Sequence, residues 1–317
     1  MKRFAVHTIP ILVATVLACT LAFGSTAHAA AATQGATRSH GHHHAVYFPT
    51  RQHWQKTHRG HVTPYYTPGG SGDLSWYGGP VQENPVVYVI FWGPNWVGSD
   101  SGAASVVQSY FNDMGSTSFE NILTQYYDNY AYVANTNTVA GVWTDTSSAP
   151  TDSSCGGPTV EDSSIQNEVA NAISANGWPT DGSNAAYFVY TPSGDYVNSG
   201  GSCSDTAGGF CAYHNWSSSV GVAYAAMAYP VDMSGCGIPS SPNGNAVGDA
   251  LTNVTSHEQF ETITDPGAGS GWVDAAGYEI GDKCAWDFSL GYTYLNGGTF
   301  ELQSEYSNAT SSCVNSY

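Results

Sequence analysis

Residues 245–264 read NAVGDALTNVTSHEQFETIT and form the most periodic helical pattern in the chain, which Pro266 ends. At about 100° per residue the apolar positions fall on one stripe, made of Val247, Ala250, Leu251 and Val254. Continuing this stripe brings His257, Glu258 and Glu261 onto the same face. Burying an unpaired carboxylate is costly. The pattern therefore predicts that a metal ion, a partner charge or an active-site cleft compensates these groups.

The string His257-Glu258-Gln259-Phe260-Glu261 is an H-E-x-x-E variant of the zincin motif H-E-x-x-H. Side chains four residues apart lie one helical turn apart on one face, so His257 and Glu261 can grip one ion. Glu258 would then stand beside the ion as general base for a metal-bound water. The motif predicts a zincin-like active helix, and its three polar side chains are expected to point into a cleft.

A further ligand has to come from downstream, and residues 277–286 read GYEIGDKCAW. Glu279 is the candidate, with Asp282 close to it, and the gap from Glu261 to Glu279 resembles that of the downstream glutamate ligand of gluzincins. Because a carboxylate replaces the second histidine of the motif, Ca²⁺ or Mn²⁺ is an alternative to Zn²⁺. The other interpretation is a buried network of histidine and carboxylates that only holds the C-terminal loops.

Helical and extended patterns alternate along the rest of the chain, which predicts an α/β or α+β domain with a mixed sheet. Val220–Tyr229 is expected to be the edge strand that precedes the active helix, as in zincins. The start T-x-x-D at Thr159 resembles a capping box for the helix at 165–175. The other expected strands are 85–92, 138–144 and 185–190, and the other expected helices are 103–114 and 119–127.

The N-terminal residues read as a secretory signal peptide, residues 1–29. Lys2 and Arg3 precede the apolar stretch 9–23, and Ala27-His28-Ala29 is a cleavage signal. A lipoprotein with Cys19 as acceptor is the alternative. The signal-peptide interpretation predicts a secreted, extracellular protein without a membrane span after cleavage. Six cysteines remain, which predicts three disulfides in an oxidising compartment. Cys203–Cys211 and Cys284–Cys313 are the expected pairs.

Charge divides the mature chain into two unlike parts. The 317 residues carry 25 acidic and 7 basic side chains, and every acidic one lies at or after Asp73. Residues 30–72 are basic and rich in histidine, and we expect them to be mostly disordered: a pro-segment or electrostatic clamp on the acidic core, a metal-binding tract or a spacer. Residues 73–317 form one acidic globular domain. With a net charge of −18 the chain lacks the basic patch of a nucleic-acid binder.

Three strings carry a resemblance to a known family: residues 208–214 (GGFCAYH), 256–266 (SHEQFETITDP) and 277–286 (GYEIGDKCAW). With the strand 86–93 (VVYVIFWG), they resemble the phosphate-induced protein 1 (EXORDIUM-like) family over residues 85–317. The resemblance implies a secreted protein, of bacterial type. The plant members are found at the cell wall and are linked to growth and cell expansion. It implies no established reaction, and the histidine-rich segment departs from the family pattern.

Two functions remain in competition at this point. The first is a secreted metallohydrolase, most simply peptidase-like, with a polypeptide or cell-wall substrate. In this hydrolase the base is Glu258, and the candidate metal ligands are His257, Glu261, Glu279 and Asp282. The second is a non-catalytic extracellular protein for the cell wall or growth signalling. An acid-active carboxyl hydrolase without metal is a weaker third hypothesis. His214 either faces the same cleft or is an ordinary half-buried histidine.

Overall fold

The structure is a computed structural model, and it describes residues 46–58, 72–180, 184–206, 208–231 and 233–317. One sheet of six strands forms the centre of the compact unit His42–Tyr317. Its strand order is β1-β9-β10-β6-β3-β4. Strands β10, β6, β3 and β4 are parallel, whereas β9 is antiparallel to both β10 and β1, so the sheet is mixed as predicted. The strands are β1 (Val46–Pro49), β3 (Val86–Trp92), β4 (Thr138–Asp145), β6 (Ala185–Tyr190), β9 (Phe210–Ser217) and β10 (Val222–Met227).

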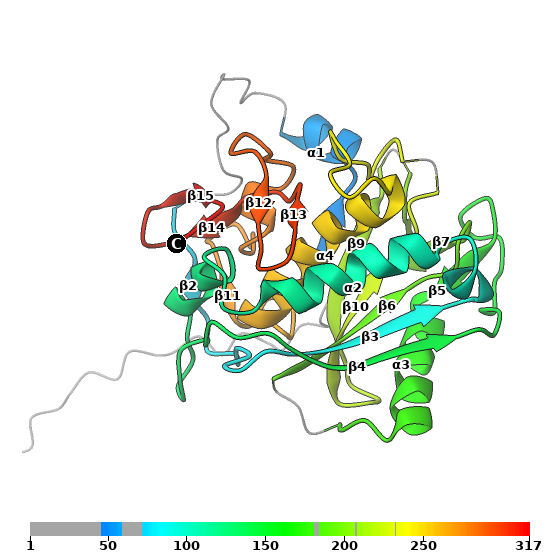
Figure 1. Cartoon of the computed structure of the whole chain (residues 1–317). Coiled ribbons are helices and arrows are strands. Elements are labelled where there is room, and N and C mark those ends of the chain that lie inside the picture. The colour runs from blue at the N-terminus through cyan, green and yellow to red at the C-terminus, as the bar shows by residue number, and fades with distance from the viewer. Residues whose placement is uncertain (1–45, 59–71, 181–183, 207, 232) are drawn as a thin grey trace, which may run out of the picture. The chain divides into compact units, whose positions relative to one another are not determined.

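Helices cover both faces of the sheet (Figure 1). Helices α2 (Ser101–Met114) and α4 (Ala246–Thr264) pack on one face, and α3 (Asp162–Asn176) packs on the other. The central strands β6 and β10 are buried along their whole length, because a sheet covered on both faces buries every side chain of its inner strands. The alternating pattern of exposed and half-buried residues in β4 fits its place at an edge.

Helix α4 is surrounded by protein on all sides. The side chain of Asn245 caps its N-terminus by accepting a hydrogen bond from the N–H of Gly248. Every residue from Gly248 to Thr264 is buried. Gly248 lets α2 approach closely, since a Cβ there would lie 2.9 Å from Cβ of Val106. The predicted apolar stripe therefore does not distinguish an inner from an outer face, and that part of the sequence argument is wrong.

The remaining elements are short and hold loops around this centre. None of the described helices is long and apolar enough to span a bilayer. Helix α1 (Arg51–Thr57) directly follows β1. The other short elements are β2 (Ser75–Trp76), η1 (Pro94–Val97), η2 (Glu120–Gln125), β5 (Thr159–Glu161), β7 (Tyr196–Ser199), β8 (Ser202–Cys203), β11 (Trp272–Val273), η3 (Asp282–Cys284), β12 (Thr293–Tyr294), β13 (Thr299–Phe300), β14 (Glu305–Ser307) and β15 (Ser312–Val314).

Three disulfides connect the loops, as the six cysteines predict, and they fit an oxidising environment. They join Cys155 to Cys203, Cys211 to Cys236, and Cys284 to Cys313. The expected pair Cys284–Cys313 is confirmed. The expected pair Cys203–Cys211 is wrong, because each of these cysteines reaches a partner that is more distant in sequence.

Several local expectations need correction. Strand β10 (Val222–Met227), expected at the edge, lies between β9 and β6, because β9 pairs with its free side. Thr159 begins strand β5 and Glu161 occupies the N-cap of α3 without a side-chain bond, so no capping box forms. The expected helix at 119–127 is the 3₁₀ turn η2.

The largest correction concerns residues 30–72. Residues 46–58 belong to the same compact unit as the sheet and contribute both a strand and a helix. The interpretation of this segment as mostly disordered is therefore wrong for that stretch. The expected signal peptide, residues 30–45 and residues 59–71 lie outside the described residues.

Candidate metal centre

Three of the predicted site residues lie together on α4. The side chains of His257, Glu258 and Glu261 are completely buried. Nε2 of His257 lies 3.0 Å from Oε1 of Glu261, which is the contact that the i, i+4 spacing predicts. The group offers one nitrogen and two carboxylate ligand atoms within 4.8 Å of one another.

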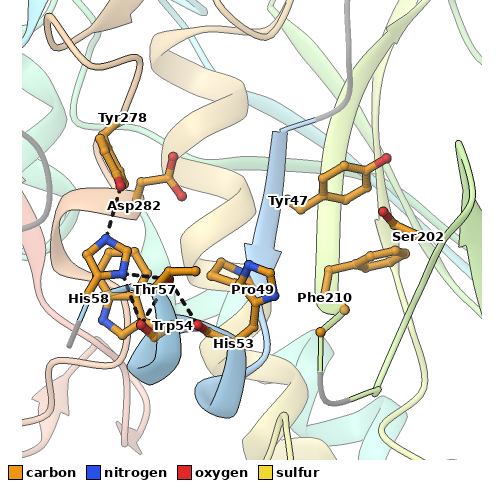
Figure 2. Close-up of a pocket in the computed structure, with 12 residues that line it drawn as sticks. Tyr47, Pro49, His53, Trp54, Thr57, His58, Ser202, Phe210, Tyr278 and Asp282 are labelled. Atoms are coloured by element: carbon orange, nitrogen blue, oxygen red, sulfur yellow. Dashed lines mark hydrogen bonds between the residues drawn. The ribbon is translucent and has the colours of Figure 1, made fainter.

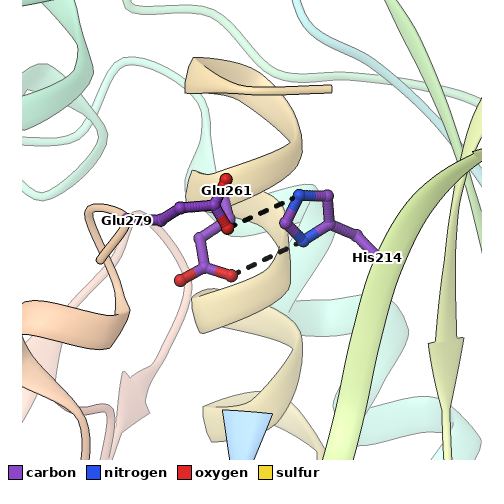
Figure 3. A group of neighbouring side chains, drawn as sticks. All are labelled: His214, Glu261 and Glu279. Carbon is purple, nitrogen blue, oxygen red and sulfur yellow. Dashed lines mark ion pairs between the residues drawn. The ribbon is translucent and has the colours of Figure 1, made fainter. Parts of the chain in front are cut away.

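The fourth member of the cluster is His214, for which the sequence left open a place in the same cleft or an ordinary half-buried position. It lies on β9 and points towards α4 (Figure 3). Its Nδ1 lies 3.1 Å from Oε2 of Glu258 and 3.5 Å from Oε2 of Glu261. The side chain is completely buried, so neither the half-buried interpretation nor a position on an open cleft holds.

The loop after α4 supplies the two remaining carboxylates. Oε2 of Glu279 lies 3.7 Å from Nε2 of His214, and Oδ1 of Asp282 lies 3.8 Å from Nε2 of His257. The backbone N–H of Asp282 donates to Oε1 of Glu261 at 3.0 Å, which fixes the loop against the helix. The expectation that Glu279 or Asp282 approaches His257 is met by Asp282.

The predicted ligands do not converge as one set. They divide into two overlapping groups, His257 with Glu258 and Glu261, and His214 with Glu261 and Glu279. Glu261 is common to both, and its carboxylate lies between the two imidazoles. Ligand atoms of one tetrahedral zinc ion are roughly 3.4 Å apart when the bonds are about 2.1 Å long. The distances from Glu261 to the two imidazoles, 3.0 and 3.5 Å, are of that size.

Several buried carboxylate oxygens of the cluster accept no hydrogen bond. Among the described residues, Oε1 of Glu258, Oε2 of Glu261 and both oxygens of Glu279 are buried without a hydrogen-bond donor. Native proteins rarely leave buried polar atoms unsatisfied, and a bound ion is one recognised reason for such atoms. The nearby Lys283 pairs with Asp274, with Nζ 3.3 Å from its Oδ2. The residues present therefore fit a divalent cation.

The two imidazoles are held differently. Nε2 of His214 lies 3.2 Å from the backbone oxygen of Asp265, which can only accept, so this nitrogen carries a proton and Nδ1 faces the carboxylates. Such a backbone partner is typical of a metal-bound histidine. In contrast, the amide nitrogen of Gln303 donates to Nδ1 of His257 at 3.0 Å. A neutral His257 then has its proton on Nε2, and ligation by Nε2 requires that this proton leave.

Without a metal, the carboxylates raise the pKa of both imidazoles. Burial lowers the pKa of His214, but the hydrogen bonds and charges of Glu258 and Glu261 outweigh it and raise the pKa to about 10. Burial likewise lowers the pKa of His257, and the carboxylates, Glu261 foremost, raise it to about 10. The cluster thus favours positive charge strongly.

The carboxylates respond in opposite directions. Burial raises the pKa of Glu261, but the two imidazoles outweigh it and bring the pKa to about 2. Burial, followed by the charge of Glu261, raises the pKa of Asp282 to about 8 and that of Glu279 well above its usual value. Burial also raises the pKa of Glu258 in spite of its bond to His214. The two imidazoles therefore supply too little positive charge to keep all four carboxylates ionised.

A cavity of about 360 Å³ lies next to the cluster (Figure 2). Asp282 is the residue that belongs to both, and Tyr47, His58 and Tyr278 contribute to the wall. The three polar side chains of α4 do not line this cavity, so the expectation that they point into a cleft is wrong. Phe48 of β1 covers His257, with its ring stacked on the imidazole at a centroid distance of 4.1 Å.

Comparison with known proteins adds nothing to this geometry: the chain matches no protein-family model, no curated protein and no solved structure. The resemblance to the phosphate-induced protein 1 family therefore stays a prediction.

Proposed function

We propose that this protein is a secreted metal-dependent hydrolase, peptidase-like in its chemistry, whose metal is held around Glu261. One observation carries the proposal: buried carboxylate oxygens without donors converge with two imidazoles on one helix, one strand and one loop. Such oxygens do not help to build a rigid core, because each buried oxygen without a hydrogen bond lowers the stability of the fold by about 1–3 kcal/mol.

The donor set indicates the metal. It combines imidazole nitrogens with carboxylate oxygens. The six cysteines of the described residues are all in disulfides, so thiolate does not contribute. Nitrogen and oxygen donors together suit Zn²⁺ first and Mn²⁺ second, whereas Ca²⁺ takes oxygen ligands. Glu261 with His214 and Glu279, or with His257 and Glu258, would hold the ion.

Glu258 is suited to move a proton. Its Oε2 is engaged by His214, whereas its Oε1 has no partner among the described residues. A bound Zn²⁺ lowers the pKa of its water to about 7. The free oxygen of Glu258, with a pKa that burial raises, would accept the proton of such a water.

The alternative is a non-catalytic extracellular protein in which the cluster is structural, acting at the cell wall or in growth signalling. Complete burial of His214, His257, Glu258 and Glu261 favours it, because catalytic groups need access to a substrate. The short contacts between imidazoles and carboxylates would then be a hydrogen-bonded network that joins β9 to α4.

Elemental analysis and activity of the purified mature protein separate the two. The hydrolase proposal expects about one Zn²⁺ or Mn²⁺ per chain, lost in Glu261→Gln, together with chelator-sensitive cleavage of a peptide library. Glu120→Gln is the matched control, since Glu120 is also a fully buried carboxylate but belongs to neither group. A fully folded protein without metal and without cleavage of any peptide would leave the structural alternative.

A further inference from the structure

Strand β1 occupies the edge of the sheet beside the cluster. It runs antiparallel to β9, with Val46 opposite His214 and Phe48 opposite Ala212. The other side of β9 is paired with β10. Without β1, the strand that carries His214 would therefore present a free edge of backbone N–H and C=O groups, and such edges bind extended peptides by adding a strand.

The ring of Phe48 anchors β1 over the site, while that of Tyr47 on the same strand stacks on Phe210. Phe48 is completely buried, and its ring stacks on His257 at 4.1 Å and on Trp286 at 4.6 Å, with 22° between the planes in both cases. The indole N–H of Trp286 donates to the backbone oxygen of Pro49 at 3.0 Å. Phe48 thus fills a recess whose floor is a residue of the candidate metal centre.

After β1 the chain passes through the buried Thr50 into helix α1, which lies nearer the surface. None of the residues of α1 is fully buried. Arg51 donates to the backbone oxygen of Gly237 at 2.6 Å and lies over the ring of Trp286 at 5.0 Å. His58, at the end of the helix, lies 3.0 Å from the hydroxyl of Tyr278. The cavity continues between α1 and the loop that carries Tyr278 and Asp282.

Charge distinguishes this stretch from the rest of the unit. Residues 46–58 contain two basic residues, Arg51 and Lys56, and no acidic one, whereas all 25 acidic residues lie at or after Asp73. A short basic segment on an acidic body gains electrostatic attraction without requiring a deep interface. The same attraction would favour other basic, extended segments.

We propose that the edge of β9, with the recess filled by Phe48, is a binding groove for an extended polypeptide, and that residues 46–58 are its built-in competitor. The ligand is a strand that runs antiparallel to β9 and places an aromatic side chain on His257. Backbone pairing supplies affinity for many sequences, and the recess selects the aromatic residue. This deepens the proposed hydrolase function by naming its substrate class, but the binding itself does not require catalysis.

The test uses the full mature chain and a fluorescein-labelled synthetic peptide with the sequence of residues 45–58. Phe48→Ala in the protein removes the anchor. The apparent affinity for the peptide is proportional to the fraction of molecules in which β1 has left the groove. In fluorescence anisotropy the Phe48→Ala protein should therefore bind the peptide at least ~10-fold more tightly than wild type. A peptide carrying its own Phe48→Ala change should bind the opened protein no better than a scrambled peptide.

Two further variants keep the result interpretable. Arg51→Ala loosens the segment from a half-buried position, so it opens the groove even if Phe48→Ala fails to fold. Gln55→Ala changes an exposed, uncharged residue of the same helix and should behave as wild type. If the folded Phe48 and Arg51 variants both bind the peptide no better than wild type, β1 is a permanent strand and the groove proposal is wrong.

Failure of this proposal differs from failure of the hydrolase proposal. Peptide binding to the opened variants without cleavage of any peptide would support the groove and argue against the enzyme. Chelator-sensitive cleavage with equal rates in wild type and Phe48→Ala would support the enzyme and overturn the role of residues 46–58.

Discussion

Oε2 of Glu258 lies 3.1 Å from Nδ1 of His214, so a carboxylate of α4 and an imidazole of β9 meet in a space closed to solvent. This contact joins the two elements that a hydrolase would use, and it is also the contact that a structural network would need.

Glu258→Gln separates these two roles. Glutamine is nearly isosteric, so an enzyme should keep its fold and metal but lose on the order of 10²-fold or more in hydrolytic rate. In a structural cluster the same change leaves His214 with an impaired partner and lowers the free energy of unfolding by about 1–3 kcal/mol. Thermal unfolding and peptide cleavage, measured on the same preparations, decide between them. Unchanged activity and unchanged stability would contradict both.

A chelator should destabilise the protein as isolated. An ion present at about 100 times its Kd adds about 2.7 kcal/mol to the free energy of unfolding, so its removal should lower Tm by about 5–10 °C for a domain of this size. Glu261→Gln should show no further loss with chelator, because it has already lost the shared ligand. Equal chelator effects in Glu261→Gln and Glu120→Gln would argue against a metal at Glu261.

The metal-free protein should become less stable as the pH rises from 4 to 8. Asp282 has a pKa of about 8 in the folded protein against 3.8 in the unfolded chain. Its contribution to the free energy of unfolding is therefore complete below pH 3.8 and is lost as the pH rises to the folded pKa of about 8. Glu279 acts in the same direction. One such group gives a slope of at most ~1.4 kcal/mol per pH unit. Urea unfolding across this range should show a shallower slope for Asp282→Asn.

At lower pH, Glu261 should affect the free energy of unfolding in the opposite direction. Its folded pKa of about 2 lies below the ordinary 4.5, so its contribution is present above 4.5 and is lost as the pH falls towards 2. In the same urea series, extended to pH 2, Glu261→Gln should remove part of the acid-induced loss. A loss of equal size in wild type and Glu261→Gln would contradict the assignment.

Gly281→Ala should disturb the cluster without changing a charge. A Cβ at this position would lie 2.6 Å from Nδ1 of His257, so the ring has to move. We expect weaker metal retention in a dialysis series and a lower Tm. Gly208→Ala is the control, because its added Cβ meets nothing closer than 3.9 Å. Equal metal retention in the two variants would show that the position of His257 does not matter.

The strands and long helices could be predicted because their signals are local. The apolar string at β3 and the periodic string at α4 needed no knowledge of their partners. The place of β10 could not be predicted, because neighbours in a sheet are decided by pairing with β9, which has no simple alternating pattern. The order of residues 46–58 could not be predicted for the same reason: they are ordered by contacts with β9 and Trp286 rather than by their own propensity.

The candidate site was predictable only where its residues lie on one helix. Helical spacing placed His257 beside Glu261. The role of His214 depends on the pairing of β9 with β10 and on the packing of that strand against α4, which no short motif encodes. Its scarcity, as one of two histidines after residue 61, was the available signal.

Helix α4 has no side in contact with water, since its residues from Gly248 to Thr264 are all buried. Most surface helices carry positions where almost any amino acid is accepted, and sequences drift fastest there. From Gly248 to Thr264 this helix offers none. In a saturation mutagenesis experiment scored by folding, this stretch of α4 should therefore appear as an unbroken block of intolerant positions, without the three- to four-residue rhythm of an ordinary helix.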